Sequence, residues 1–126
     1  MKLDLNQITI SVKDVEQSIA FYEKLGLRLI VKALPKYARF ECVNGTTTFS
    51  LHQSDEEVKP TTWIYFETDN VKADVEQLQA SGVAFDLLPT QQSWLWEEAH
   101  CKDSDGNKII IYHAGKNRKN PPWRIN

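Results

Sequence analysis

The chain begins with two patterns of apolar residues that differ in period. In residues 6–12, NQITISV, every second side chain is apolar, which predicts a strand with one buried face. From residue 15 to residue 25, apolar side chains recur at the spacing of one helix face. Asp14 is suited to cap the start of this helix, and Gly26 is suited to end it. The chain is therefore expected to start with a strand followed directly by an amphipathic helix.

Three short strands are expected after this helix, at residues 27–33, 37–43 and 46–52. The dipeptide Asn44-Gly45 separates the last two strands, and it is typical of a tight hairpin turn. Residues 53–60 are polar and acidic and end in a proline, so they are expected to form a short linker. The first half of the chain thus predicts one β-α-β-β-β unit.

The same order of elements recurs after a shift of 56 positions. Apolar residues and a helix-ending glycine coincide between the copies: Ile8 with Ile64, Val15 with Val71, Ile19 with Val75, and Gly26 with Gly82. The second copy predicts a strand at 62–68, a helix at 71–80, and strands near 83–87, 94–101 and 108–113. We expect a single domain at 1–126, with module one at about 5–53, module two at about 61–113 and a tail at 114–126.

Composition narrows the class of protein without indicating an activity. The 126 residues suffice for a hydrophobic core, and 41% hydrophobic with 25% charged residues is typical of an ordinary globular domain. A net charge of −2 argues against nucleic-acid binding, and no apolar run is long enough for a membrane span. The N-terminus lacks signal-peptide features, so a cytoplasmic location is expected. Cys42 and Cys101 have no metal-binding spacing and are expected to be buried thiols.

Two segments resemble a known superfamily. The segment ITISVKDVEQSIAFYEKLGL is similar to the first strand and helix of the vicinal oxygen chelate superfamily, and KDSDGNKIIIYH is similar to its closing hairpin. This superfamily includes glyoxalases, extradiol dioxygenases and bleomycin- and fosfomycin-resistance proteins, and the resemblance covers roughly residues 5–113. It implies an α+β fold in which two βαβββ modules form a curled mixed sheet, a cup, with the helices on the outer face. It also favours a homodimer, because such cups are often completed by a second subunit, and a monomer that pairs its own two modules is the alternative.

In the metal-dependent branches of the superfamily, four strand positions supply the ligands of a divalent metal ion. The resemblance places these positions at Gln7, Ser50, Trp63 and Ile110. Metal ions require nitrogen, oxygen or sulfur donors, and neither Trp63 nor Ile110 supplies one. We therefore expect no metal cofactor at the usual site.

Strand periodicity predicts which other side chains face the cup. The expected ligand-binding residues are Gln7, Ser50, His52, Trp63, Tyr65, Trp96, His100, Ile110 and Tyr112, with Thr9, Thr48, Glu67 and Glu98 on the same faces. Ala99 and Cys101 are assigned to the helix-packed core, and His113 is expected on the face opposite Tyr112. Aromatic walls with a few polar groups suit a small-molecule pocket. The same rings could instead fill the cup and leave a structural domain without a pocket.

Three functions compete on this evidence. The favoured one is a metal-independent protein that binds a small aromatic or amphipathic ligand, because it needs none of the missing metal ligands. The second is a glyoxalase- or dioxygenase-like enzyme in which His52, Glu98 and His100 form a relocated metal site or an acid–base pair. The third is an assembly module that acts through its surface, including the tail. Trp123 and Ile125 favour a tail docked on the cup or on another subunit, and a frayed terminus is the alternative.

Overall fold

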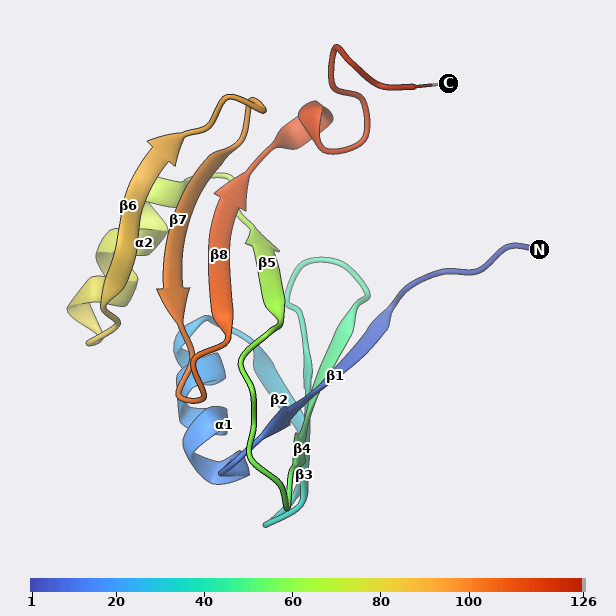
Figure 1. Ribbon diagram of the computed structural model, residues 1–126, viewed down its shortest axis with the longest axis vertical. Helices are drawn as coiled ribbons and strands as arrows, with labels where there is room; N and C mark the ends of the chain where they lie inside the picture. The colour runs from blue at the N-terminus through green and yellow to red at the C-terminus, as the bar shows by residue number, and fades with distance from the viewer. Residues whose placement is uncertain (126) are drawn as a thin grey trace. The chain divides into compact units, whose positions relative to one another are not determined.

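A computed structural model describes residues 1–125 of the chain. It divides into two compact units (Figure 1). The first unit comprises Met1–Pro60 together with Asp103–Asp105, and the second comprises Thr61–Lys102 together with the chain from Gly106 onward. Each unit contains one copy of the predicted β-α-β-β-β module.

The first unit is built from β1 (Gln7–Val12), α1 (Val15–Lys24), β2 (Arg28–Ala33), β3 (Tyr37–Glu41) and β4 (Thr48–Gln53). Its four strands form a sheet in the order β1-β4-β3-β2. The β1 strand runs parallel to β4, whereas β3 runs antiparallel to both β4 and β2. The sheet is therefore mixed, and α1 provides the crossover that parallel strands require.

The second unit repeats this arrangement. It contains β5 (Trp63–Glu67), α2 (Val71–Ala80), β6 (Phe85–Gln91), β7 (Glu97–Lys102) and β8 (Lys108–His113). The strand order is β5-β8-β7-β6, with β5 parallel to β8. A short 3₁₀ helix, η1 (Gly115–Asn117), follows β8. The predicted α+β fold of two βαβββ modules is confirmed, and each module has its own mixed sheet.

Both helices begin and end as the sequence predicts. The Asp14 side chain accepts a hydrogen bond from the Gln17 backbone N–H, and Asn70 caps α2 in the same way through Ala73. Just past the helices, Gly26 and Gly82 take φ values of +89° and +96°, a conformation that favours glycine. No helix in residues 1–125 is both long and apolar enough to cross a membrane.

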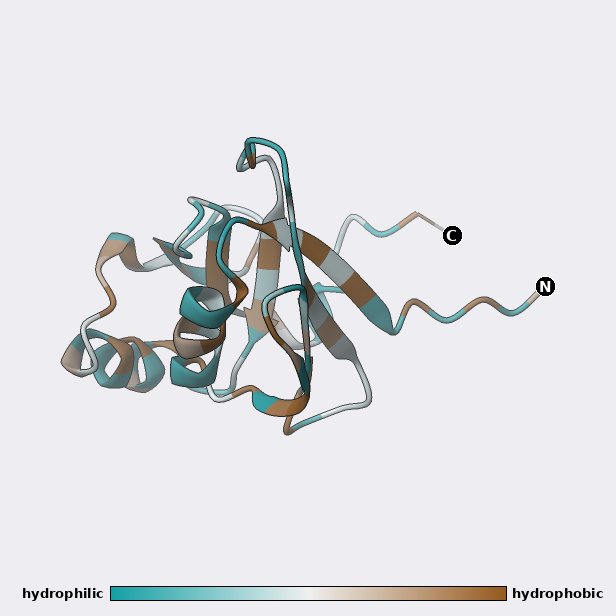
Figure 2. Ribbon diagram, turned by 90° about the horizontal axis from the view of Figure 1, so that it is seen from below, coloured by the Kyte–Doolittle hydropathy of each residue, from teal (hydrophilic) through white to brown (hydrophobic). Residues whose placement is uncertain are grey.

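The core of the first unit lies between α1 and one face of its sheet. The Tyr22 ring packs 4.9 Å from the Phe49 ring, centroid to centroid, and 6.2 Å from the Phe40 ring. The Tyr22 hydroxyl donates a 2.5 Å hydrogen bond to Asp103, so this buried phenol has a polar partner. Figure 2 shows hydrophilic and hydrophobic residues interleaved along both helices, as expected of helices with one buried face.

The core of the second unit is formed in the same way by α2 and its sheet. Val71, Val75 and Leu78 of α2 are buried. Ala99 and Cys101 on β7 are fully buried as well, which confirms their assignment to the helix-packed core. By strand alternation, the neighbouring side chains of β7 lie on the other face of this sheet.

Several predicted strand ends were wrong. The loop between β3 and β4 is longer than a two-residue hairpin, because β3 ends at Glu41 and β4 begins at Thr48. The β6 strand starts later and extends to Gln91, with irregular pairing to β7. The β7 strand starts at Glu97, so the three residues before it lie in a turn and outside the strand. This turn positions the predicted site residue Trp96 and its neighbour Trp94.

Candidate functional site

The face of the second sheet opposite Ala99 and Cys101 gathers most of the predicted side chains of module two. Strand register places side chains in two rows across this face: Tyr65, Ile110 and His100 in one row, and Glu67, Tyr112 and Glu98 in the next. Trp63 lies one further row along, opposite Lys108, whose ammonium group sits 4.2 Å from the centre of the indole. The face therefore combines aromatic rings with ionisable groups.

Three rings, Tyr65, Trp96 and Tyr112, form a continuous aromatic cluster. Trp96 and Tyr112 are stacked with centroids 4.9 Å apart, and Tyr65 meets both rings edge-on at 5.9 and 5.5 Å. Tyr112 is buried, whereas Tyr65 is 41% exposed and Trp63 is 59% exposed. Ile110 is fully buried and packs with Tyr112 and Trp96. The cluster thus has a packed base and an exposed aromatic edge.

Beside this cluster lies a buried carboxylate with two hydrogen-bond partners. Glu98 is 2% exposed, and its carboxylate accepts a 2.7 Å hydrogen bond from the indole N–H of Trp94. Its other oxygen lies 2.8 Å from Nε2 of His100. When the carboxylate is ionised it can only accept, and Nε2 of His100 then carries the proton. In neutral His100 the remaining nitrogen, Nδ1, is then a base.

The two indoles are positioned by the turn before β7. Leu95, between Trp94 and Trp96, has φ +69°, in the left-handed region that disfavours a leucine. The turn is closed by hydrogen bonds between the backbones of Gln92 and both Leu95 and Trp96. Strained backbone of this kind persists where surrounding contacts hold it, and it often marks functional sites. Here the contacts are the indole hydrogen bonds to Glu98 and to the Asn117 carbonyl.

The start of the tail docks at the end of the same face. Glu67 accepts hydrogen bonds from the backbone N–H groups of Ala114 and Gly115, at 2.7 and 2.9 Å. The Trp96 indole N–H donates to the Asn117 carbonyl. The side chains of Trp123 and Ile125 stay largely exposed in this chain, and docking of the tail on another subunit stays a prediction. Backbone groups hold the tail in place.

Four predicted residues of module one, Gln7, Thr9, Thr48 and Ser50, belong to a polar network in the first unit. Gln7 Nε2 donates to the Ser50 hydroxyl at 2.8 Å, and the Thr48 hydroxyl donates to Gln7 Oε1. The Ser50 hydroxyl also lies 2.7 Å from the Tyr37 hydroxyl, which accepts a 2.9 Å hydrogen bond from Nε of Arg39. Sequence reasoning missed Tyr37 and Arg39, although they alternate with buried residues on β3 as side chains of an open face do.

Three tyrosines of these faces have shifted pKa values. Burial raises the pKa of Tyr65 above its usual 10.0, and the charge of Glu98 adds to the effect. Burial also raises the pKa of Tyr112, with a further contribution from Glu67. Burial opposes ionisation of Tyr37, but hydrogen bonds to Ser50 and Arg39 outweigh it, so its pKa is lowered. Tyr37 therefore favours the phenolate more than the other two.

The three proposed catalytic candidates do not all belong to one group. Glu98 and His100 are hydrogen-bonded partners in the second unit. His52 lies in the first unit, is exposed, and pairs with Tyr37 across β4 and β3. His113 lies on the opposite face from Tyr112, as expected, and its Nδ1 is 2.8 Å from the Thr68 carbonyl oxygen.

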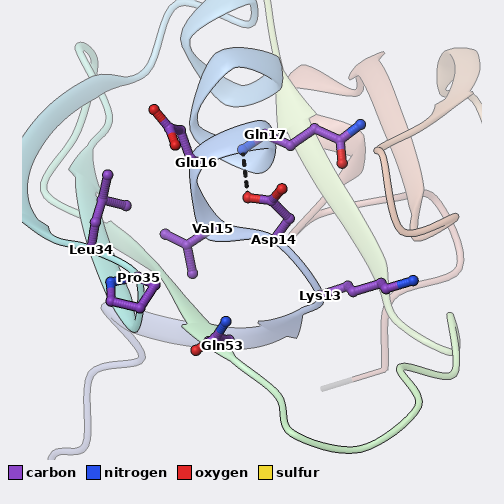
Figure 3. A pocket seen from close by; sticks show the side chains of 8 residues that line it. All are labelled: Lys13, Asp14, Val15, Glu16, Gln17, Leu34, Pro35 and Gln53. Carbon is purple, nitrogen blue, oxygen red and sulfur yellow. Dashed lines mark hydrogen bonds between the residues drawn. The ribbon is translucent and has the colours of Figure 1, made fainter.

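A surface cavity of about 550 Å³ lies elsewhere, at the start of α1 (Figure 3). It is lined by Lys13, Asp14, Val15, Glu16, Gln17, Leu34, Pro35 and Gln53. Figure 3 shows the Asp14 carboxylate turned onto the backbone nitrogen of Gln17, so it serves as the helix cap. None of the residues predicted to bind a ligand lines this cavity.

Two βαβββ modules with mixed sheets define a protein of the vicinal oxygen chelate type. The model of the Glyoxalase/Bleomycin resistance protein/Dioxygenase superfamily matches residues 4–111, and the chain belongs to this superfamily. No curated protein matches the sequence.

Solved structures show the same fold at low sequence identity. A glyoxalase/bleomycin resistance protein/dioxygenase from Nocardioides has a TM-score of 0.80 at 19% identity, covering 100% of this chain and 91% of that one. A lactoylglutathione lyase from Agrobacterium tumefaciens has a TM-score of 0.74 at 15% identity, covering 87% and 92%. An integron cassette protein from V. cholerae has a TM-score of 0.73 at 22% identity, covering 90% of this chain and 97% of that one.

The residues at the metal positions of the superfamily do not fit a metal ion. Ser50 already shares its hydroxyl with Gln7 and Tyr37, and Ile110 is a buried hydrocarbon side chain. Trp63 offers an indole, which is not a metal ligand. In residues 1–125, no group of three or more His, Cys, Asp or Glu side chains is arranged to hold a metal ion.

Proposed function

We propose that the protein binds a small planar aromatic ligand at the exposed Trp63 and Tyr65 edge of the second sheet, without a divalent metal. The observation that carries this proposal is the aromatic cluster, whose stacked base is buried and whose Tyr65 edge is exposed. Exposed rings of Trp63 and Tyr65 offer flat apolar surface, and a planar ligand gains by stacking on it. Glu98 and His100 supply the sparse polar groups that orient a ligand.

The chemistry of the side chains supports a ligand site that needs no metal ion. The side chains of Trp63 and Ile110 supply no donor, and those of Gln7 and Ser50 are engaged with each other. A ligand held by ring stacking and a few hydrogen bonds needs no ion. Protein treated with a chelator is therefore expected to bind as well as protein supplied with Zn²⁺, Ni²⁺ or Mn²⁺.

The binding proposal is tested by titrating 2-naphthol, a neutral planar aromatic, into the protein by isothermal titration calorimetry. Tyr65→Ala removes the exposed edge of the cluster and is expected to weaken binding by about five- to tenfold, the loss of one aromatic contact. Trp123→Ala is the matched control, because it deletes an exposed ring outside the cluster. Equal affinity of the wild type and Tyr65→Ala, or binding that appears only with added metal, would contradict the proposal.

A second function is favoured by the Glu98–His100 pair. A carboxylate that fixes the Nε2 proton of an imidazole leaves Nδ1 to accept a proton from a ligand, as in general base catalysis. The reaction class would be proton abstraction next to a carbonyl group. Acetophenone in D₂O tests it, because a base of this kind exchanges the methyl protons faster than buffer does, and NMR measures the rate. If the wild type and His100→Ala both exchange the methyl protons at the buffer rate, the catalytic function is refuted and only the binding proposal remains.

A further inference from the structure

The polar network of the first unit contains an arginine without an acidic partner. Arg39 is partly buried on β3, and its Nε donates to the Tyr37 hydroxyl at 2.9 Å. Its guanidinium also lies 5.5 Å from the centre of the Tyr37 ring. None of the ion pairs among residues 1–125 includes Arg39. A partly buried cation normally pairs with an anion, so this one is available to a ligand.

The neighbours of Arg39 hold it and Tyr37 in a fixed geometry. Ser50 is fully buried, and its hydroxyl lies 2.7 Å from the Tyr37 hydroxyl. Gln7 Nε2 donates to Ser50, and the Thr48 hydroxyl donates to Gln7, so each group in the chain is held by the next. Side chains oriented in this way lose little conformational entropy when a ligand binds.

Strand register shows that Tyr37 and Arg39 of the first module are equivalent to Glu98 and His100 of the second, so both modules carry ionisable groups at these positions. In the first unit, Tyr37 and Arg39 pair with His52 and Ser50. In the second unit, Glu98 and His100 pair with Tyr112 and Ile110 in the same pattern. Both pairs are joined by a hydrogen bond between residues two apart on the third strand of their module. The repeat therefore presents two different polar pairs on equivalent sheet faces.

We propose that Arg39 and Tyr37 form a binding site for the carboxylate group of a small-molecule ligand on the first unit. Nε of Arg39 is engaged with Tyr37, which leaves the two Nη groups of the planar guanidinium to donate to the two oxygens of a carboxylate. The Tyr37 hydroxyl can add a third donor when the Ser50 hydroxyl donates to it, because the proton of Tyr37 is then free for the ligand. One guanidinium and one hydroxyl match a single negative charge, whereas a dianionic phosphate requires more positive charge.

This proposal does not depend on the aromatic cluster. Every group that it uses belongs to the first unit, whereas the proposed aromatic site uses groups of the second unit. The probe is therefore non-aromatic: cyclohexanecarboxylate, with its neutral isostere cyclohexanecarboxamide as the comparison. The two compounds present the same ring, so a difference in their binding reports the carboxylate.

Binding is followed by ¹⁵N NMR of arginine Nε–H signals, with the Arg39 signal identified by its loss in Arg39→Lys. Cyclohexanecarboxylate is expected to shift this signal saturably, and the carboxamide is not. Arg39→Gln and Tyr37→Phe, followed through neighbouring backbone amides, are expected to weaken binding, by about tenfold or more for the arginine. Arg28→Gln is the matched control, because Arg28 is an exposed arginine paired with Glu41.

Each other outcome would overturn the proposal. Equal affinity in the wild type and in folded Arg39→Gln would show that the guanidinium does not bind the carboxylate. Equal weakening by Arg28→Gln would show a general effect of positive charge on the unit. Inorganic phosphate that binds more tightly than cyclohexanecarboxylate would overturn the assignment of a singly charged carboxylate. A signal that fails to shift saturably in wild-type protein would remove the site altogether.

Discussion

The hydrogen bond between Glu98 and His100 makes a strong prediction about the stability of the second unit. The Glu98 side chain is 3% exposed and the His100 side chain is 18% exposed, so solvent cannot replace a lost partner on the carboxylate. His100→Ala leaves Glu98 with the hydrogen bond from the Trp94 indole. A hydrogen bond to a charged group contributes about 1.5–3 kcal/mol, and we expect a loss of that size.

The coupling between the two residues is measured with a double-mutant cycle of Glu98→Ala, His100→Ala and the double variant. The expected coupling energy is about 1.5–3 kcal/mol, because the single changes each remove the same hydrogen bond. His113→Ala is the matched control: His113 is an exposed histidine whose Nδ1 contacts the Thr68 carbonyl, and its loss is expected to cost less than about 1 kcal/mol.

Urea unfolding followed by tryptophan fluorescence is the appropriate assay. All four tryptophans, at 63, 94, 96 and 123, belong to the second unit, so the signal reports the unit that contains the pair. With a slope of about 1–3 kcal/mol per molar urea, a loss of 2 kcal/mol moves the midpoint by about 1 M. A coupling energy below about 0.5 kcal/mol would refute the reasoning, because the buried carboxylate would then not depend on His100.

Three further predictions concern the same faces. Leu95→Gly is expected to raise the free energy of unfolding by about 1 kcal/mol, measured by urea unfolding, because glycine adopts φ +69° without strain. Because the pKa of Tyr65 is raised above 10.0, folded protein keeps this proton longer than unfolded protein, and the free energy of unfolding should fall as the pH rises past 10.0. Tyr65→Phe should make that fall shallower in urea unfolding at several pH values. Glu67→Gln weakens the acceptor of the Ala114 and Gly115 N–H groups, so trypsin should cleave the tail at Lys116 and Arg118 faster than in wild type.

The fold followed from local signals in the sequence. Each helix has an acidic or amide cap, a 3.6-residue apolar period and a final glycine, and all three signals act within a few residues. The match between the two halves after a shift of 56 positions then predicted that the second half repeats the β-α-β-β-β order. Strand ends were predicted less well, because Leu95 adopts a conformation that sequence pattern does not favour in a leucine. The apolar pattern therefore predicts a strand at residues 94–96, where the structure has a turn.

The candidate site could be predicted in part. Alternation placed Glu98, His100 and Tyr112 on one face, and their contacts agree with it. Tyr37 and Arg39 were missed, because their hydrogen bond depends on how β3 pairs with β4. Pairing across strands of distant sequence position is set by tertiary contacts, which a single sequence does not display.

The side chains at positions 110 and 50 give the two sheets different faces. A metal-binding carboxylate at position 110 would need open space and coordinating partners, whereas Ile110 is fully buried and packs with Tyr112 and Trp96. Burying this side chain contributes on the order of 1.5–3 kcal/mol, so the position now supports the stacked rings. The equivalent position in the first unit, Ser50, instead holds a hydroxyl that orients Tyr37. The two modules thus share a backbone register, while one presents stacked aromatic rings and the other a hydrogen-bonded arginine.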